Sequence, residues 1–224
     1  MNEEELTGGK YYHIYNCGIN GENLFRNKEN YEHFLGLLDK YILPVSDLLA
    51  WVLMPNHFHL LVRIKEDMVY KYTKPVNQDN TEWFHDHKWE TMDRSAFGAT
   101  ENLMQPKPHL HFSHLFNAYC KYYNKLHARH GGLFERRFKR KHVNHERYFQ
   151  RLVLYIHNNP VYHGFCTHAL EYPWSSYLTC ITIKPTKLKR DILMGWFDSE
   201  ANFKIKHNEI IDFEMMDKWL GLED

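Results

Sequence analysis

The sequence has few cysteines for its 224 residues, and they form no close pairs. Zinc knuckles, redox motifs and disulfide scaffolds need cysteines at short, regular spacings. We therefore expect reduced thiols at all four positions, which are Cys17, Cys120, Cys166 and Cys180.

Long hydrophobic runs are also missing. The longest apolar stretch, around residues 48–55, is far shorter than the roughly 18 residues that a membrane helix needs. The opening Met-Asn-Glu-Glu-Glu is acidic, whereas a secretory signal begins with basic residues. These features predict a cytoplasmic protein with no membrane partner.

Neither sign of charge predominates, because 28 Lys and Arg residues balance 28 Asp and Glu residues. A protein that is basic throughout is excluded, so any nucleic-acid surface must be local. A content of 43% hydrophobic residues is typical of a folded chain. The length fits one domain with an insertion or an extension.

Hydrophobic spacing predicts an α+β fold. The predicted order is strand, helix, strand, strand, helix, strand, helix. Its first six elements are typical of a ferredoxin-like antiparallel sheet with helices on one face, and the seventh is an added helix. The predicted strands are 10–17, 48–53, 58–64 and 133–143, and the predicted helices are 27–44, 111–131 and 144–159.

Two stretches fall outside this order. Residues 65–108 mix charges and isolated tryptophans without a sustained period, which indicates an insertion or mobile loop within a domain spanning 1–182. Residues 183–224 are predicted to form a helical extension. Its end is more acidic than basic, so we expect it not to touch a phosphate backbone.

The predicted strand 58–64 begins beside His57-Phe58-His59. Side chains two positions apart on a strand share a face, so His57 and His59 can converge on one metal ion. By itself the pair is equally well explained by strand histidines packed among aromatic side chains. A third ligand is needed to decide.

The last predicted helix supplies one. Tyr155 and Asn159 lie one turn apart beside its apolar stripe. Pro160 is expected to end the helix at about Asn159, near the negative end of the helix dipole, where a cation is favoured. Taken singly, the two residues have alternative interpretations as an ordinary amphipathic tyrosine and a helix cap.

A basic run lies between the two predicted helices and is interrupted by Phe138. Such a run can neutralise phosphates even in a neutral protein, and nearby aromatic rings can stack on unpaired bases. The alternative is a solvated strand edge. The predicted DNA-binding residues are Arg136, Arg137, Lys139, Arg140 and Lys141.

Over roughly residues 8–180, the chain resembles the REP-associated tyrosine transposases, which belong to the HUH superfamily of single-strand DNA nucleases. The matching segments, in order, are Tyr12-His-Ile-Tyr-Asn-Cys-Gly, Leu53-Met-Pro-Asn-His-Phe-His-Leu-Leu, Gly132-Leu-Phe-Glu-Arg-Arg-Phe-Lys-Arg, Tyr155-Ile-His-Asn-Asn-Pro-Val and Tyr172-Pro-Trp-Ser-Ser-Tyr.

The resemblance implies that His57, His59 and Asn159 hold a divalent metal ion and that Tyr155 is the nucleophile. The activity implied is that of a transposase, cutting single-stranded or hairpin DNA through a 5′-phosphotyrosine. Mg²⁺ and Mn²⁺ both suit this chemistry, and nitrogen ligands favour Mn²⁺. No base for Tyr155 is evident, and both a monomer and a homodimer are open.

Other functions remain open from the sequence. A protein of the same fold could bind hairpin DNA without cutting it. A ferredoxin-like RNA-binding module would stack bases on sheet aromatics and need no metal. A hydrolase that uses water in place of the tyrosine would turn over without a covalent intermediate.

Overall fold

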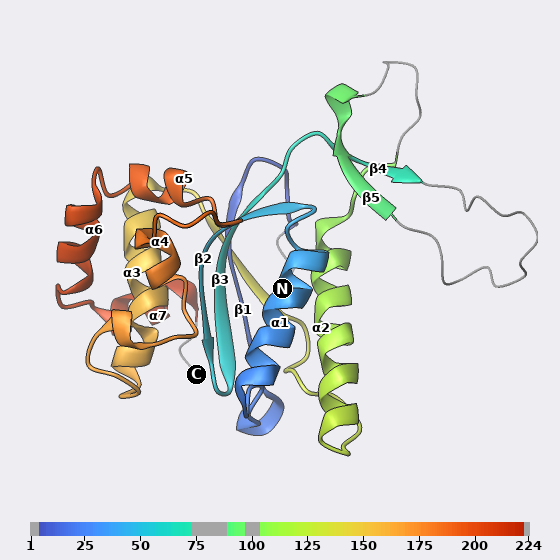
Figure 1. Ribbon diagram of the computed structural model, residues 1–224, viewed down its shortest axis with the longest axis horizontal. Helices are drawn as coiled ribbons and strands as arrows, with labels where there is room; N and C mark the ends of the chain where they lie inside the picture. Colours follow the sequence, from blue (N-terminus) through green and yellow to red (C-terminus); the bar gives the residue numbers. More distant parts are fainter. Residues whose placement is uncertain (1–4, 73–88, 97–103, 222–224) are drawn as a thin grey trace, which may run out of the picture.

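A four-stranded antiparallel sheet forms the centre of the computed structural model, which describes residues 5–72, 89–96 and 104–221. The strand order is β2-β3-β1-β6, and each neighbouring pair is antiparallel (Figure 1). This order confirms the predicted ferredoxin-like α+β fold. The strands are β1 (Tyr11–Cys17), β2 (Ser46–Met54), β3 (His57–Ile64) and β6 (Lys139–Val143).

Two helices, α1 (Lys28–Tyr41) and α2 (Pro108–Leu126), cover one face of this sheet (Figure 1). Helix α1 begins at the predicted cap, because the Asn27 side chain accepts a hydrogen bond from the Asn30 amide at 3.0 Å. Phe58 of β3 lies on this face, with its ring centroid 5.3 Å from that of Phe34 in α1. These aromatic contacts hold the helical layer on the sheet.

Helix α3 (Glu146–Tyr162) lies on the opposite face, with the C-terminal helices packed around it (Figure 1). The prediction that α3 ends at about Asn159 is wrong, because the helix continues through Pro160. The lost proline hydrogen bond is tolerated so near the end, where the His163 amide still donates to the Asn159 carbonyl at 3.1 Å. The C-terminal helices are α4 (Tyr177–Ile181), α5 (Arg190–Gly195), α6 (Glu200–His207) and α7 (Phe213–Leu220).

The segment 172–176 covers the outer edge of β2, the edge strand nearest to α4. Leu53 donates its amide proton to the Trp174 carbonyl at 2.9 Å, and the Ser176 amide donates to the Trp51 carbonyl at 2.9 Å. The Tyr172 hydroxyl donates to the Leu53 carbonyl at 2.8 Å. Backbone groups of an edge strand need such partners when they are buried.

The expectation of an insertion without regular structure over 65–108 is wrong in part. Strands β4 (Met68–Tyr72) and β5 (Trp89–Asp93) pair as a two-stranded antiparallel sheet that projects beyond the main sheet (Figure 1). Strands of five residues show too little alternation to reveal the pairing in the sequence. Residues 73–88 and 97–103 of this stretch lie outside the described residues.

No helix in the described ranges is both long enough and apolar enough to cross a membrane. The remaining short elements are the 3₁₀ turns η1 (Ile19–Gly21), η2 (Arg94–Ala96) and η3 (Ala169–Glu171). The division of the chain at residue 182 stays a prediction.

Candidate active site

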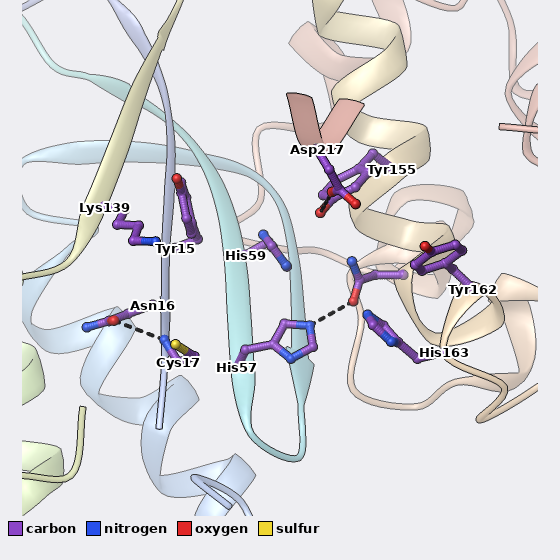
Figure 2. Close-up of a pocket in the computed structure, with 11 residues that line it drawn as sticks. Tyr15, Asn16, Cys17, His57, His59, Lys139, Tyr155, Tyr162, His163 and Asp217 are labelled. Carbon is purple, nitrogen blue, oxygen red and sulfur yellow. Dashed lines mark hydrogen bonds between the residues drawn. The ribbon is translucent and has the colours of Figure 1, made fainter. Parts of the chain in front are cut away.

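A pocket of about 240 Å³ lies between the sheet and helix α3, on the face opposite α1 and α2 (Figure 2). Strand side chains form one wall, and side chains from α3 and α7 form the other. The lining residues that bear on chemistry are His57, His59, Lys139, Tyr155, Asn159 and Asp217. The structure therefore brings together the two histidines, the tyrosine and the amide that the sequence singles out.

The strand register places His57 and His59 on one face. His59 lies opposite Tyr15 of β1 and His57 lies opposite Cys17, so both side chains point toward α3. Phe58, between them, points to the other face and packs against the helical layer. The side chains of residues 57–59 therefore alternate between the two faces of the sheet, as the sequence predicts.

Each of these histidines has one ring nitrogen engaged by a neighbour. His57 Nδ1 lies 2.8 Å from Asn56 Oδ1, and His59 Nδ1 lies 2.9 Å from His13 Nε2. Metal-bound histidines commonly donate the proton on their second nitrogen to such an acceptor, which fixes the ring. The nitrogens that could bind a metal ion are therefore His59 Nε2 and His57 Nε2, the latter beside Asn159.

The contact between His57 and Asn159 brings two potential metal ligands together. His57 Nε2 lies 2.9 Å from Asn159 Oδ1 (Figure 2), while His57 Nδ1 faces the oxygen of Asn56. A neutral imidazole has one N–H and cannot donate to both oxygens. Burial lowers the pKa of His57 to about 4, so the doubly protonated ring is disfavoured at neutral pH. A metal ion would be held by both lone pairs.

The side chains near the histidine pair also limit which groups could bind a metal ion there. Within the described ranges, no group of three or more His, Cys, Asp or Glu side chains comes together as a metal site. The Asn159 amide oxygen, 2.9 Å from His57 Nε2, is in position to complete the histidine pair as a third ligand. Two imidazoles and an amide suit Mn²⁺ or Mg²⁺ with open positions for water or phosphate.

Tyr155 lies on the α3 wall, with its ring edge against His59 at a centroid distance of 5.4 Å. The residue is only 3% exposed. Its hydroxyl donates a hydrogen bond to Asp217 Oδ1 at 2.8 Å. Burial and the Asp217 carboxylate together raise the pKa of Tyr155 well above its ordinary value, so the resting hydroxyl is protonated.

The basic run does not form one continuous strand. Arg137 has φ of 64°, and regular pairing with β1 begins only at Lys139, so the prediction of a strand from 133 is wrong. Lys139 and Lys141 lie opposite Tyr15 and His13, on the face of the pocket.

The remaining cations of the run lie elsewhere. Arg140 points to the other face, where its guanidinium lies 5.1 Å from the centroid of the Phe138 ring. Arg136 and Arg137 lie before the strand. Of the five predicted DNA-binding residues, only Lys139 lines the pocket.

Sequence reasoning misses His13, Asn56 and Asp217. The first could have been found, because His13 and Tyr15 alternate along the first predicted strand. Asn56 lies in the turn just before the histidine pair. Asp217 gives no sequence signal, since it belongs to the extension that we expected to stay away from phosphate.

A solved structure of a REP-associated tyrosine transposase bound to a REP hairpin is similar to this chain. The two share 14% identity, with a TM-score of 0.50, over 81% of this chain and 84% of the other. The chain has the fold of that transposase. No protein-family model matches the sequence, and no curated protein matches it.

The similarity to this transposase concerns the fold. It agrees with the architecture described above and with the resemblance seen in the sequence. The metal ion, the nucleophile, the DNA partner and a homodimer stay predictions.

Proposed function

We propose that this protein is a metal-dependent single-strand DNA endonuclease and strand transferase that acts on hairpin-forming DNA. The observation that carries the proposal is the meeting of His57, His59, Asn159 and Tyr155 around one pocket. His57 and Asn159 come from a strand and a helix that are far apart in sequence, yet His57 Nε2 lies 2.9 Å from Asn159 Oδ1.

His57, His59 and Asn159 would hold Mg²⁺ or Mn²⁺. Bound there, the ion would supply Lewis-acid polarisation of the phosphate and would stabilise the charge of the transition state. His13 and Asn56 would fix the two imidazole rings by accepting the protons on their Nδ1 atoms.

Tyr155 would attack the phosphorus of a phosphodiester in the pocket. The new bond joins the tyrosine to the 5′ side of the break and frees a 3′-hydroxyl. Because the phosphotyrosine conserves the ester bond, the strand can be rejoined without ATP. Lys139, on the pocket wall, would offset the negative charge of the phosphate.

The test is a search for a covalent adduct. Purified protein is incubated with labelled single-stranded hairpin oligonucleotides in Mn²⁺, in Mg²⁺ or in chelator, and the products are separated on denaturing gels. We expect a metal-dependent adduct that is absent in Tyr155→Phe. Tyr148→Phe, two turns earlier on α3, is the matched control and should keep the adduct.

Other outcomes would identify the alternatives. Tight hairpin binding without an adduct in any metal would favour a non-cleaving DNA-binding protein. Metal-dependent cutting that survives Tyr155→Phe would favour water as the nucleophile. Preferential binding of single-stranded RNA without a metal requirement would favour the RNA-binding module.

A further inference from the structure

A tyrosine nucleophile needs a group to take its proton. A free phenol has a pKa near 10, so few tyrosines are ionised at neutral pH. A proton acceptor within hydrogen-bond distance of the hydroxyl would remove this barrier as the bond to phosphorus forms.

Asp217 occupies that position. Its Oδ1 lies 2.8 Å from the Tyr155 hydroxyl, and Figure 2 shows its carboxylate beside the tyrosine on the pocket wall. It lines the pocket together with the two histidines. A phosphate in this pocket would therefore meet the nucleophile and the carboxylate together.

Helix α7 holds Asp217 in place through aromatic contacts at both ends. Near its start, Phe213 stacks on Tyr162 at 4.2 Å between ring centroids. Near its end, Trp219 stacks on Tyr148 at 4.4 Å with an interplanar angle of 7°. These contacts fix the helix to α3, the same helix that carries Tyr155, so the nucleophile and the carboxylate are positioned relative to each other.

Three nearby histidines are engaged by other groups. His59 Nδ1 faces His13, and both nitrogens of His57 face asparagine oxygens. His157, two positions after Tyr155, bonds to His207 and Ser176 on the far side of α3. A carboxylate is also acceptor-only when ionised, as a proton acceptor must be.

We propose that Asp217 is the general base that activates Tyr155, an inference that rests on the proposed function. The Tyr155 proton passes to Asp217 Oδ1 while a phenolic lone pair forms the O–P bond and the bond from phosphorus to the 3′ oxygen breaks. The leaving 3′ oxygen takes a proton from water, and Asp217 keeps the proton that it took from Tyr155. In rejoining, Asp217 gives this proton back to the departing tyrosine oxygen as the 3′-hydroxyl attacks phosphorus and releases its own proton to water.

The experiment compares adduct formation by the wild-type chain, Asp217→Asn and Asp217→Ala on the same hairpin substrate in Mn²⁺. Asp217→Asn keeps the shape of the side chain and removes its basicity, so we expect cleavage to slow by roughly 10²- to 10⁴-fold with hairpin affinity unchanged. Sodium formate should restore part of the activity of Asp217→Ala by replacing the missing carboxylate. Glu214→Gln, which neutralises an exposed carboxylate on the same helix, is the control and should cleave at the wild-type rate.

Each outcome of this experiment supports or overturns the assignment of Asp217 as the general base. Slow cleavage by Asp217→Asn together with formate rescue of Asp217→Ala supports the proposal, because a merely structural carboxylate would not be replaced by a free one. Cleavage by Asp217→Asn at or above the wild-type rate overturns it and assigns Asp217 to covering the nucleophile. Loss of cleavage without formate rescue also overturns it. Failure of the wild-type chain to form any Tyr155 adduct would instead overturn the proposed function, and this inference with it.

Discussion

Ser176 links helix α3 to the edge of the sheet, and its replacement by alanine should destabilise the protein strongly. Its hydroxyl oxygen accepts a hydrogen bond from the Trp51 amide at 2.9 Å and lies 2.7 Å from His157 Nε2. His157 Nδ1 in turn lies 2.9 Å from His207 Nε2, and His207 Nδ1 donates to the Phe203 carbonyl at 2.7 Å. This chain of hydrogen bonds places one proton on each ring, at Nδ1 of His207 and at Nδ1 of His157, so that His157 Nε2 accepts from the Ser176 hydroxyl.

The magnitude follows from the groups that lose their partners. Ser176 and His157 are fully buried, so no solvent reaches the vacated site. Leaving a buried donor or acceptor unsatisfied costs about 1–3 kcal/mol, so losing the bonds to Trp51 and His157 should cost about 2–6 kcal/mol. A single domain has only about 5–15 kcal/mol of stability in total.

Ser175→Ala is the matched control, one position earlier in the same segment. Its hydroxyl makes only long contacts of 3.4 Å, to the Tyr172 carbonyl and the Tyr177 amide. We expect a loss of about 0.5–1.5 kcal/mol. Equilibrium urea unfolding at pH 7.5, followed by tryptophan fluorescence and circular dichroism, measures both variants. A loss in Ser176→Ala no larger than that in Ser175→Ala would refute the reasoning.

Three further predictions follow from the pocket and its histidines. Burial lowers the pKa of His57 and of His207 to about 4, so between about pH 6.5 and pH 4 the unfolded chain binds protons that the folded chain does not. Stability should be complete above that window and fall with decreasing pH, by about 1.4 kcal/mol per pH unit for each histidine, as measured by urea midpoints in chelator. Mn²⁺ should raise the melting temperature of the wild-type chain, with a stabilisation of about 2.7 kcal/mol at a Mn²⁺ concentration one hundred times its Kd. Thermal melts of Asn159→Ala should show that most of this stabilisation is lost. Lys139→Ala should slow adduct formation roughly 10-fold, equivalent to about 1.4 kcal/mol. Arg140→Ala should slow it less, because Lys139 lines the pocket and Arg140 does not. Equal effects of the two substitutions in gel assays would contradict this prediction.

Features that depend on local periodicity can be predicted from the sequence. Alternation along a strand puts His57 and His59 on one face, and helical spacing puts Tyr155 and Asn159 together. The order of strands and helices was sufficient to predict the ferredoxin-like sheet, because few topologies accommodate it. These properties depend on residues that are close together in the sequence.

Contacts between distant segments were decided only by the tertiary structure. The register of β6 on β1 selects Lys139 for the pocket, although a run of cations looks uniform in the sequence. Packing of α7 on α3 brings Asp217 to Tyr155, 62 positions earlier in the chain. Pro160 stays helical because the surrounding turn satisfies the backbone. Such pairings depend on how whole elements bury their apolar faces against one another, and the local spacing of residues does not specify this packing.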